Sequence, residues 1–185
     1  VRVTDSRVCS SVNNRPLSNK CLEIKSILVD ACMPSASNWD KNNEMVFFQV
    51  GTTPINASQL SVSWPQGNWA SICTNDAYIQ WANRRILGGG VVLPIPQDNI
   101  LPSNANVLIF TGGPDTALYD FSSLSDTLYA LFQCDGNGGV MNFFPNQSST
   151  SSIERLIINL GSICADTVYY LSLIHILTLP TILLV

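Results

Sequence analysis

Turn-forming residues divide this chain into short apolar runs, and this division limits the folds that it can adopt. The clearest run spans residues 43–51, in which residues 45–50 place apolar side chains on both faces of an extended chain. Such a run predicts a strand at the centre of a sheet, where both faces are covered. Residues 101–110 repeat the pattern, with a Pro- and Asn-containing turn before a second apolar run. Short strands separated by turns about every ten residues are typical of a β-sandwich.

Other runs also carry the strand pattern. Residues 21–29 begin with a period of two, in which apolar residues alternate with Glu23 and Lys25. Residues 60–64 alternate in the same way before a proline ends the run. Further strands are predicted at residues 91–93, 107–110, 128–134, 140–144, 153–160 and 167–171.

One segment has helical spacing instead. Tyr78, Ala82 and Ile86 recur at intervals of four, after a Thr-Asn-Asp start signal and before the glycines at 88–90. This spacing predicts a helix over about residues 76–86, closed by a flexible glycine cap. The chain as a whole is therefore predicted to be an all-β, immunoglobulin-like β-sandwich of about eight or nine strands with one short inserted helix.

The composition favours a single packed domain with few charges. Of the 185 residues, 46% are apolar and 12% are charged, and the formal net charge is −4. These values argue against disorder and give no electrostatic reason to expect nucleic acid as a partner. We predict that the sandwich spans residues 21–170. Residues 1–20 are predicted to be an irregular segment or the end of a preceding domain.

The cysteines indicate disulfides. An even number without closely spaced pairs favours disulfides in an oxidising compartment over a zinc site. Buried free thiols in a reduced protein are the alternative. Spacing does not fix the pairing, although a local Cys9–Cys21 loop and a cross-strand Cys134–Cys164 bridge are plausible. The disulfide candidates are Cys9, Cys21, Cys32, Cys73, Cys134 and Cys164.

The last residues form a separate apolar tail, because no charged residue follows Asp166. A membrane anchor would need about 20 apolar residues, and polar residues interrupt this stretch without basic residues after it. Residues 171–176 instead resemble a translated sequencing adapter. We therefore predict that residues 171–185 are a non-native tail and that the domain has no membrane span. Since His175 is the only histidine, the natural domain would then have no histidine for catalysis or metal binding.

Two stretches carry a family resemblance. Asn43-Glu44 leading into the apolar run 45–48 resembles a motif of the lamin tail domain family. Ile100-Leu101-Pro102 before the strand 107–110 resembles a second motif of that family. The region 24–170 is similar to divergent lamin-tail-like domains in large surface proteins of Gram-negative bacteria. Those proteins often also carry gliding-motility-type sorting domains.

The resemblance implies an immunoglobulin-like fold, an extracellular or cell-surface location in bacteria, and neighbouring domains in a larger chain as partners. Export by the type IX pathway is implied only because those surface proteins often carry such sorting domains. The family supplies no catalytic residues and no cofactor, so none is predicted. The inserted helix departs from the simplest pattern of the family.

Glu44 is the strongest candidate for chemistry, because it lies at the start of the buried run 45–50. A glycosidase would need a second acid within roughly 5–10 Å. Three residues could be proposed for that role: Asp40, Asp126 and Asp166. The alternative is that Glu44 accepts hydrogen bonds at the strand start and serves the fold, as a buried carboxylate requires. We favour this structural role.

Two further groups could bind a ligand. Asp135 and Asn137 have the alternating oxygen ligands of a calcium loop, but the closing acid is missing, so we predict a glycine-rich hairpin turn there. Trp64 and Trp69, with Trp39 and Trp81, could form a platform for stacking sugars. Such aromatic residues more often pack in the core or against loops. Exposed, coplanar rings at Trp64 and Trp69 would favour sugar binding.

The sequence therefore predicts a non-catalytic, extracellular structural or adhesive module of a larger bacterial surface or secreted protein. Its ligand, if it has one, would be a protein or a glycan at the surface. A carbohydrate-binding module of a secreted enzyme is the alternative. A hydrolase that uses Glu44 and a second acid is the third hypothesis.

Overall fold

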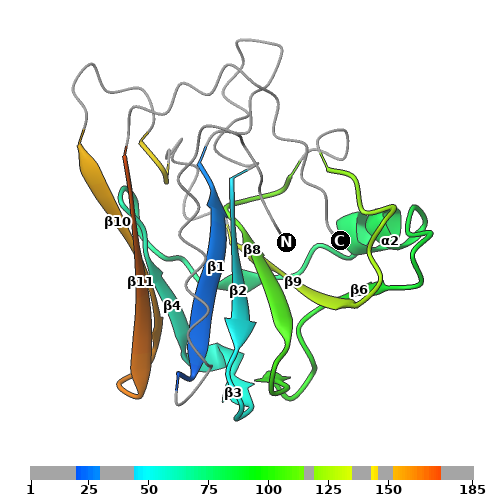
Figure 1. Cartoon of the computed structure of the whole chain (residues 1–185), viewed down its shortest axis with the longest axis horizontal. Coiled ribbons are helices and arrows are strands. Elements are labelled where there is room, and N and C mark those ends of the chain that lie inside the picture. The colour runs from blue at the N-terminus through cyan, green and yellow to red at the C-terminus, as the bar shows by residue number, and fades with distance from the viewer. Residues whose placement is uncertain (1–19, 30–43, 115–118, 135–142, 146–151, 172–185) are drawn as a thin grey trace.

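The computed structural model describes residues 20–29, 44–114, 119–134, 143–145 and 152–171. Within them, two sheets face each other as a sandwich, and the short helix α2 lies against the outer face of the larger sheet (Figure 1). An all-β sandwich with one short helix is thus confirmed.

The larger sheet has the strand order β1-β2-β8-β9-β5, and β6 also pairs with β9. The β6 strand pairs with the start of β9 and β5 with its end, so these two short strands share one edge. The pairings of β8 and β6 with β9 are parallel, whereas the other pairings in this sheet are antiparallel. The strands are β1 (Leu22–Leu28), β2 (Met45–Val50), β5 (Ile72–Cys73), β6 (Val91–Leu93), β8 (Asn106–Phe110) and β9 (Thr127–Gln133).

The smaller sheet has three antiparallel strands in the order β11-β10-β4. In a separate two-stranded sheet, β3 pairs with β7, and the 3-10 helix η1 leads directly into β4. These elements are β3 (Ile55–Asn56), η1 (Ala57–Gln59), β4 (Leu60–Ser63), β7 (Ile100–Leu101), β10 (Ile153–Leu160) and β11 (Cys164–Leu171).

Side chains from both faces of the larger sheet are buried, and this creates two cores. On β2, Val46 and Phe48 face the smaller sheet, while Met45 faces α2. The strand also lies between β1 and β8, which confirms the predicted central position of residues 45–50. Each fully buried apolar side chain of this size contributes about 1.5–3 kcal/mol.

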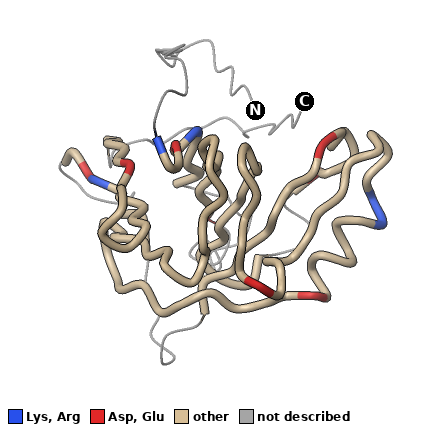
Figure 2. The backbone as a smooth tube through the Cα atoms, turned by 90° about the horizontal axis from the view of Figure 1, so that it is seen from below, with Lys and Arg blue, Asp and Glu red and all other residues tan. Residues whose placement is uncertain are grey.

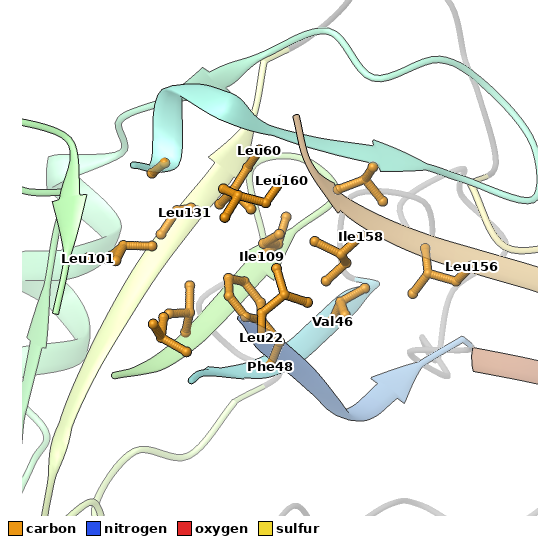
Figure 3. Close-up of a cluster of buried hydrophobic side chains, with 14 of the residues drawn as sticks. Leu22, Val46, Phe48, Leu60, Leu101, Ile109, Leu131, Leu156, Ile158 and Leu160 are labelled. Carbon is orange, nitrogen blue, oxygen red and sulfur yellow. The ribbon is translucent and has the colours of Figure 1, made fainter. Parts of the chain in front are cut away.

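The inter-sheet core fills the space between the two sheets (Figure 3). It includes Leu22, Val46, Phe48, Ile109, Leu131, Leu156 and Ile158. The helix-side core is rich in aromatic residues. There Phe110 and Phe132 stack with centroids 5.2 Å apart, and the Tyr78 ring meets both at an edge. Such aromatic pairs add stability beyond the burial of their area.

The helix α2 (Asp76–Asn83) is shorter than the predicted span 76–86. It begins at Asn75, whose side chain accepts a hydrogen bond from the Tyr78 amide, as an N-cap residue does. The glycines after it do not form a flexible cap. A Cβ at Gly88 would lie 2.5 Å from the Leu124 carbonyl oxygen, so this glycine allows two chain segments to approach closely.

Other boundaries differ in smaller ways from the prediction. The last strand, β11, begins three residues earlier than predicted. Residues 143–144, predicted as part of a strand, are a bend, and residues 140–142 lie outside the described part. The strands β3, β5 and β7 were not predicted, because each has two residues and no periodicity of its own.

Charged residues are sparse along the described chain (Figure 2). The two ion pairs among the described residues are Lys20 with Asp166 and Lys25 with Glu23. No helix in this part of the chain is long and apolar enough to cross a membrane. Apart from Leu171, which ends β11, the predicted non-native tail lies outside the described residues.

Candidate functional site

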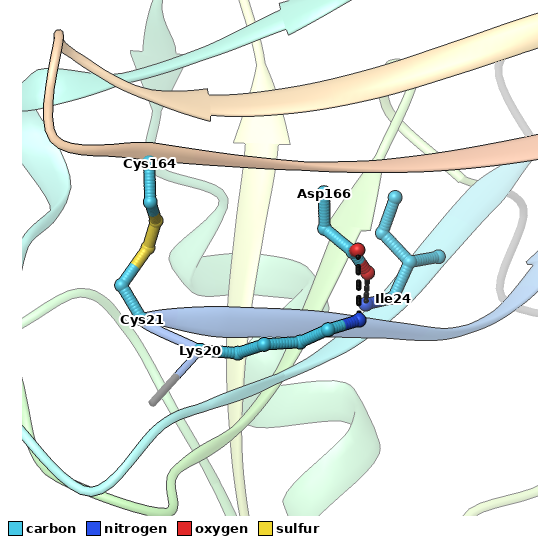
Figure 4. The surroundings of a disulfide bond; sticks show 5 residues. All are labelled: Lys20, Cys21, Ile24, Cys164 and Asp166. Carbon is cyan, nitrogen blue, oxygen red and sulfur yellow. Dashed lines mark hydrogen bonds and ion pairs between the residues drawn. A yellow bond between two sulfur atoms is a disulfide. The ribbon is translucent and has the colours of Figure 1, made fainter. Parts of the chain in front are cut away.

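A disulfide closes one side of the sandwich. Cys21, just before β1, is bonded to Cys164, the first residue of β11, and their Cα atoms are 6.4 Å apart (Figure 4). The Asp166 carboxylate reinforces the junction by accepting hydrogen bonds from the Ile24 amide at 2.8 Å and from the Lys20 ammonium at 3.1 Å. The two sheets are therefore joined covalently and by a charge-assisted hydrogen bond. Asp166 therefore has a structural role at the junction of β1 and β11.

The second disulfide joins Cys73 of β5 to Cys134, directly after β9, with Cα atoms 5.0 Å apart. Both pairings expected from spacing are wrong, since Cys21 pairs with Cys164 and Cys134 pairs with Cys73. The remaining candidates, Cys9 and Cys32, lie outside the described residues. Two disulfides indicate a non-reducing environment.

Glu44 is completely buried directly before β2. Its backbone carbonyl oxygen accepts hydrogen bonds from the Thr111 amide at 3.1 Å and from the Thr111 hydroxyl at 3.0 Å. These bonds connect the start of β2 to the end of β8. A glycosidase needs carboxylates that flank an accessible cleft. The burial of Glu44 therefore favours the structural role over the hydrolase hypothesis.

The three proposed acid partners of Glu44 have other settings. Asp126 is exposed, and its carboxylate accepts hydrogen bonds from the Thr127 amide and from the Asn106 side chain. Asp166 is bound at the junction described above. Asp40 lies outside the described residues.

An acid that sequence reasoning missed, Glu154, acts electrostatically on the same buried residue as Glu44. Burial raises the pKa of the Tyr170 phenol far above its usual range, and the charges of Glu154 and Glu44 raise it further. Glu154 and Tyr170 are register partners on β10 and β11. A signal was present in the sequence, because Glu154 falls on the inward side of the alternating run 153–160.

Trp64 and Trp69 are not the exposed, coplanar pair that would favour a sugar-stacking platform. Trp64 is only 7% exposed, and its indole nitrogen donates a hydrogen bond to the buried Gln133 at 2.5 Å. The rings of Trp64 and Trp69 have centroids 6.5 Å apart and are inclined by 39°, so they are not coplanar. Trp81 packs against Arg85, whose guanidinium carbon lies 4.3 Å from the centre of the Trp81 ring. Trp39 lies outside the described residues.

Trp69 does line a pocket of about 290 Å³, which we call the Trp69 pocket. Its residues come from η1, the starts of β4 and β5, the segment between these two strands, the turn before α2, and the loop between β6 and β7. They are Ala57, Ser58, Leu60, Trp69, Ser71, Ile72, Thr74, Ile95 and Asn99. Only the tryptophan marked this region in the sequence. The other residues are distant along the chain and are gathered by the fold.

Two rim residues of the pocket are held in unusual backbone conformations. Ser71 has φ of 138° and Asn99 has φ of 59°, in a region that residues other than glycine rarely occupy. The Ser71 carbonyl accepts a hydrogen bond from the Cys134 amide, and the Asn99 carbonyl accepts one from the Ala57 amide. The rim is therefore fixed by the second disulfide on one side and by η1 on the other.

The calcium candidates Asp135 and Asn137 lie outside the described residues, so their role stays a prediction. Within the described ranges, no three acidic, histidine or cysteine residues are grouped as metal ligands. Searches against protein families, curated proteins and solved structures found no match to this chain.

Proposed function

We propose that the chain is a non-catalytic structural and adhesive module of a larger bacterial surface or secreted protein, located outside the cell. The disulfides support an oxidising location, and the resemblance to lamin tail domains supports a non-catalytic module beside neighbouring domains. The structural part of this role is to carry tension between the neighbours.

The Cys21–Cys164 disulfide is the observation that carries the proposal. It connects the start of the first described strand to the start of the last one, across a sequence separation of 143 residues. Tension applied at the two chain ends passes through this covalent bond instead of through the hydrogen bonds of the sheets. Only β11 and the segments outside the bridge can then be pulled out, so the module stays short under load.

Single-molecule pulling on the intact chain, with handles at both ends, tests this role. A separation of 143 residues corresponds to about 500 Å of extended chain, at about 3.5 Å per residue. We expect the oxidised wild type to release none of this length. The variant in which Cys21 and Cys164 are both serine should release only about 300 Å, because Cys73–Cys134 still withholds a separation of 61 residues.

Two further variants complete the design. Serine at Cys73 and Cys134 alone is the matched control, and it should release no interior length because the outer bridge is intact. With serine at all four positions, about 500 Å of chain should be free to extend, whether the domain is folded or not, because neither bridge withholds any length. If the oxidised wild type releases its interior length at the same force as the variant without Cys21–Cys164, the module is not load-bearing and the structural proposal is wrong.

A further inference from the structure

The Trp69 pocket has an apolar floor and a polar rim. Leu60, Ile72 and Ile95 supply the floor, and the half-buried Trp69 ring supplies one wall. Trp64 contacts Trp69 from the core, which limits the orientations that the outer ring can adopt. Apolar walls with a few placed polar groups are typical of small-molecule sites.

Charge is missing from the lining. None of the nine residues around the pocket is Asp, Glu, Lys, Arg or His. A phosphate, a carboxylate or an ammonium group would enter without an opposite charge, and that costs free energy. The ligand that fits the lining is therefore neutral.

The rim consists of hydroxyl and amide groups, on Ser58, Ser71, Thr74 and Asn99. A hydroxyl both donates and accepts hydrogen bonds, and an asparagine amide offers both functions side by side. A sugar presents the same pair of functions around its edge. Its axial C–H groups also form an apolar face that can lie on an indole ring.

We infer that the Trp69 pocket binds one residue of a neutral saccharide, with the sugar face on Trp69 and its hydroxyls on the rim. The volume of about 290 Å³ is just below the range of about 300–1,000 Å³ for small-molecule sites, which suits one ring better than a long chain. The hydroxyls of Ser58 and Ser71 already donate hydrogen bonds to the Asn56 side chain and the Cys134 sulfur. They can still accept hydrogen bonds from sugar hydroxyls, which an aliphatic peptide side chain cannot donate.

The backbone of the rim agrees with a ligand site. Ser71 and Asn99 are two of the three non-glycine residues with positive φ in the described chain, and both line this pocket. Such conformations cost free energy and are common where a site is preorganised for binding. Preorganisation reduces the entropy that a small ligand must lose on binding.

This inference rests on the adhesive part of the proposed function. It assigns a ligand class to the adhesive role, and it does so without the coplanar pair of Trp64 and Trp69. Its test keeps all cysteines intact, so a failure here leaves the load-bearing role untouched, and the reverse also holds.

NMR titration of the ¹⁵N-labelled chain with methyl glycosides of glucose, galactose, mannose and N-acetylglucosamine tests the inference. At least one glycoside, at up to about 50 mM, should shift the indole N–H signal of Trp69, since a ligand of this size binds weakly. The Trp81 indole, which packs against the helix-side core and does not line the pocket, is an internal reference. A Trp69→Phe variant assigns the Trp69 signal.

Two variants locate the site. Thr74→Arg adds a long side chain at an exposed rim position and should weaken binding about tenfold or more, at little cost to the fold. Thr167→Arg, at an exposed position of β11 outside the pocket, is the matched control and should bind as the wild type does. The Trp69→Ala variant should lose binding, and Thr74→Arg decides the matter if that variant does not fold.

Three results would overturn the inference. The first is that no glycoside shifts the Trp69 signal. The second is that binding persists in Thr74→Arg at wild-type strength. The third is that N-acetyl-leucinamide shifts the Trp69 signal and the glycosides do not, which would make the pocket a peptide site.

Discussion

Two buried aromatic residues, Trp64 and Tyr170, place a polar atom inside the sandwich in different ways. The Trp64 indole N–H is paired with Gln133, which is itself only 4% exposed. The Tyr170 hydroxyl is buried and has no hydrogen-bond partner among the described residues. Its ring packs at an edge on Phe144, with centroids 5.7 Å apart. The hydroxyl of Tyr170 therefore contributes little to stability that its ring does not already provide.

The buried phenol makes folding sensitive to high pH. Burial, Glu154 and Glu44 raise the pKa of Tyr170 above the ordinary 10.0, so the folded chain holds this proton more tightly than the unfolded chain does. This difference in pKa contributes to the free energy of unfolding. The contribution is fully present below pH 10, the ordinary value, and is lost as the pH rises above it. We expect Tyr170→Phe to leave the free energy of unfolding unchanged or slightly higher at neutral pH, and to lose less of it at alkaline pH.

Urea unfolding at about pH 8 and at about pH 11 measures this difference. Tyr169→Phe, at the neighbouring exposed position, is the matched control and should lose as much stability as the wild type. If Tyr170→Phe and the wild type lose equal stability between the two pH values, the phenol is not responsible.

For single residues, burial could be predicted from the sequence more reliably than the contacts that each buried residue makes. Glu44 was correctly placed at a buried strand start, because the residues after it are apolar on both faces. Trp64 was a candidate for exposure, because its partner Gln133 is distant in the sequence and nothing local indicates the hydrogen bond. The pattern of residues 153–160 placed Glu154 on the inward side, but its influence on Tyr170 had no local signal, because it depends on the register of β10 and β11.

Among the elements, α2 protects an edge of the larger sheet with one side chain. The Asn83 amide donates a hydrogen bond to the Val92 carbonyl at 2.8 Å, and its oxygen accepts one from the Val92 amide at 2.8 Å. It replaces the neighbouring strand that β6 lacks on this side. Backbone groups at a sheet edge need such partners when they are removed from water, and Val92 is only 1% exposed.

Asn83→Ala should therefore lower the free energy of unfolding by about 1–3 kcal/mol, since it leaves a buried amide and a buried carbonyl without partners. Asn83→Asp should have an intermediate effect, because a carboxylate still accepts from the Val92 amide but cannot donate. Urea unfolding followed by circular dichroism provides the values. Gln80→Ala, on the exposed side of the same helix, should be close to neutral. An Asn83→Ala variant as stable as Gln80→Ala would contradict this role.

The predictability of the elements follows from their length. Alternation located β1, and continuous or nearly continuous apolar runs located β2 and β10, to within one or two residues, because each strand is long enough to show a pattern. The strands β3, β5 and β7 are held by their partners, as Ile55 is by Leu101 and Ile72 by Gln133. The parallel pairing of β8 with β9 also has no local signal, since it depends on the path of the chain between the two strands.

In the whole molecule, the two disulfides brace different places. Cys21–Cys164 joins the two sheets, whereas Cys73–Cys134 fixes the short β5 strand to the end of β9. Neither pairing could be predicted from spacing. Their separations of 143 and 61 residues bring together positions that become neighbours only when the sheets have formed. Spacing favours a short local loop such as Cys9–Cys21, because a short loop has a smaller entropic cost of closure.

Loss of both disulfides should bring the domain close to its stability limit. A native disulfide contributes about 2–5 kcal/mol, mainly by restricting the unfolded chain, and a domain of this size has about 5–15 kcal/mol in total. Serine at either pair alone should leave a folded domain with a lower melting temperature. Serine at both pairs should leave it largely unfolded at about 37 °C, since the two losses together approach the whole stability. Thermal unfolding of the four proteins by circular dichroism measures the series. If the protein without either disulfide melts within a few degrees of the wild type, the bridges do not stabilise the fold, and the argument for an oxidising location loses its main support.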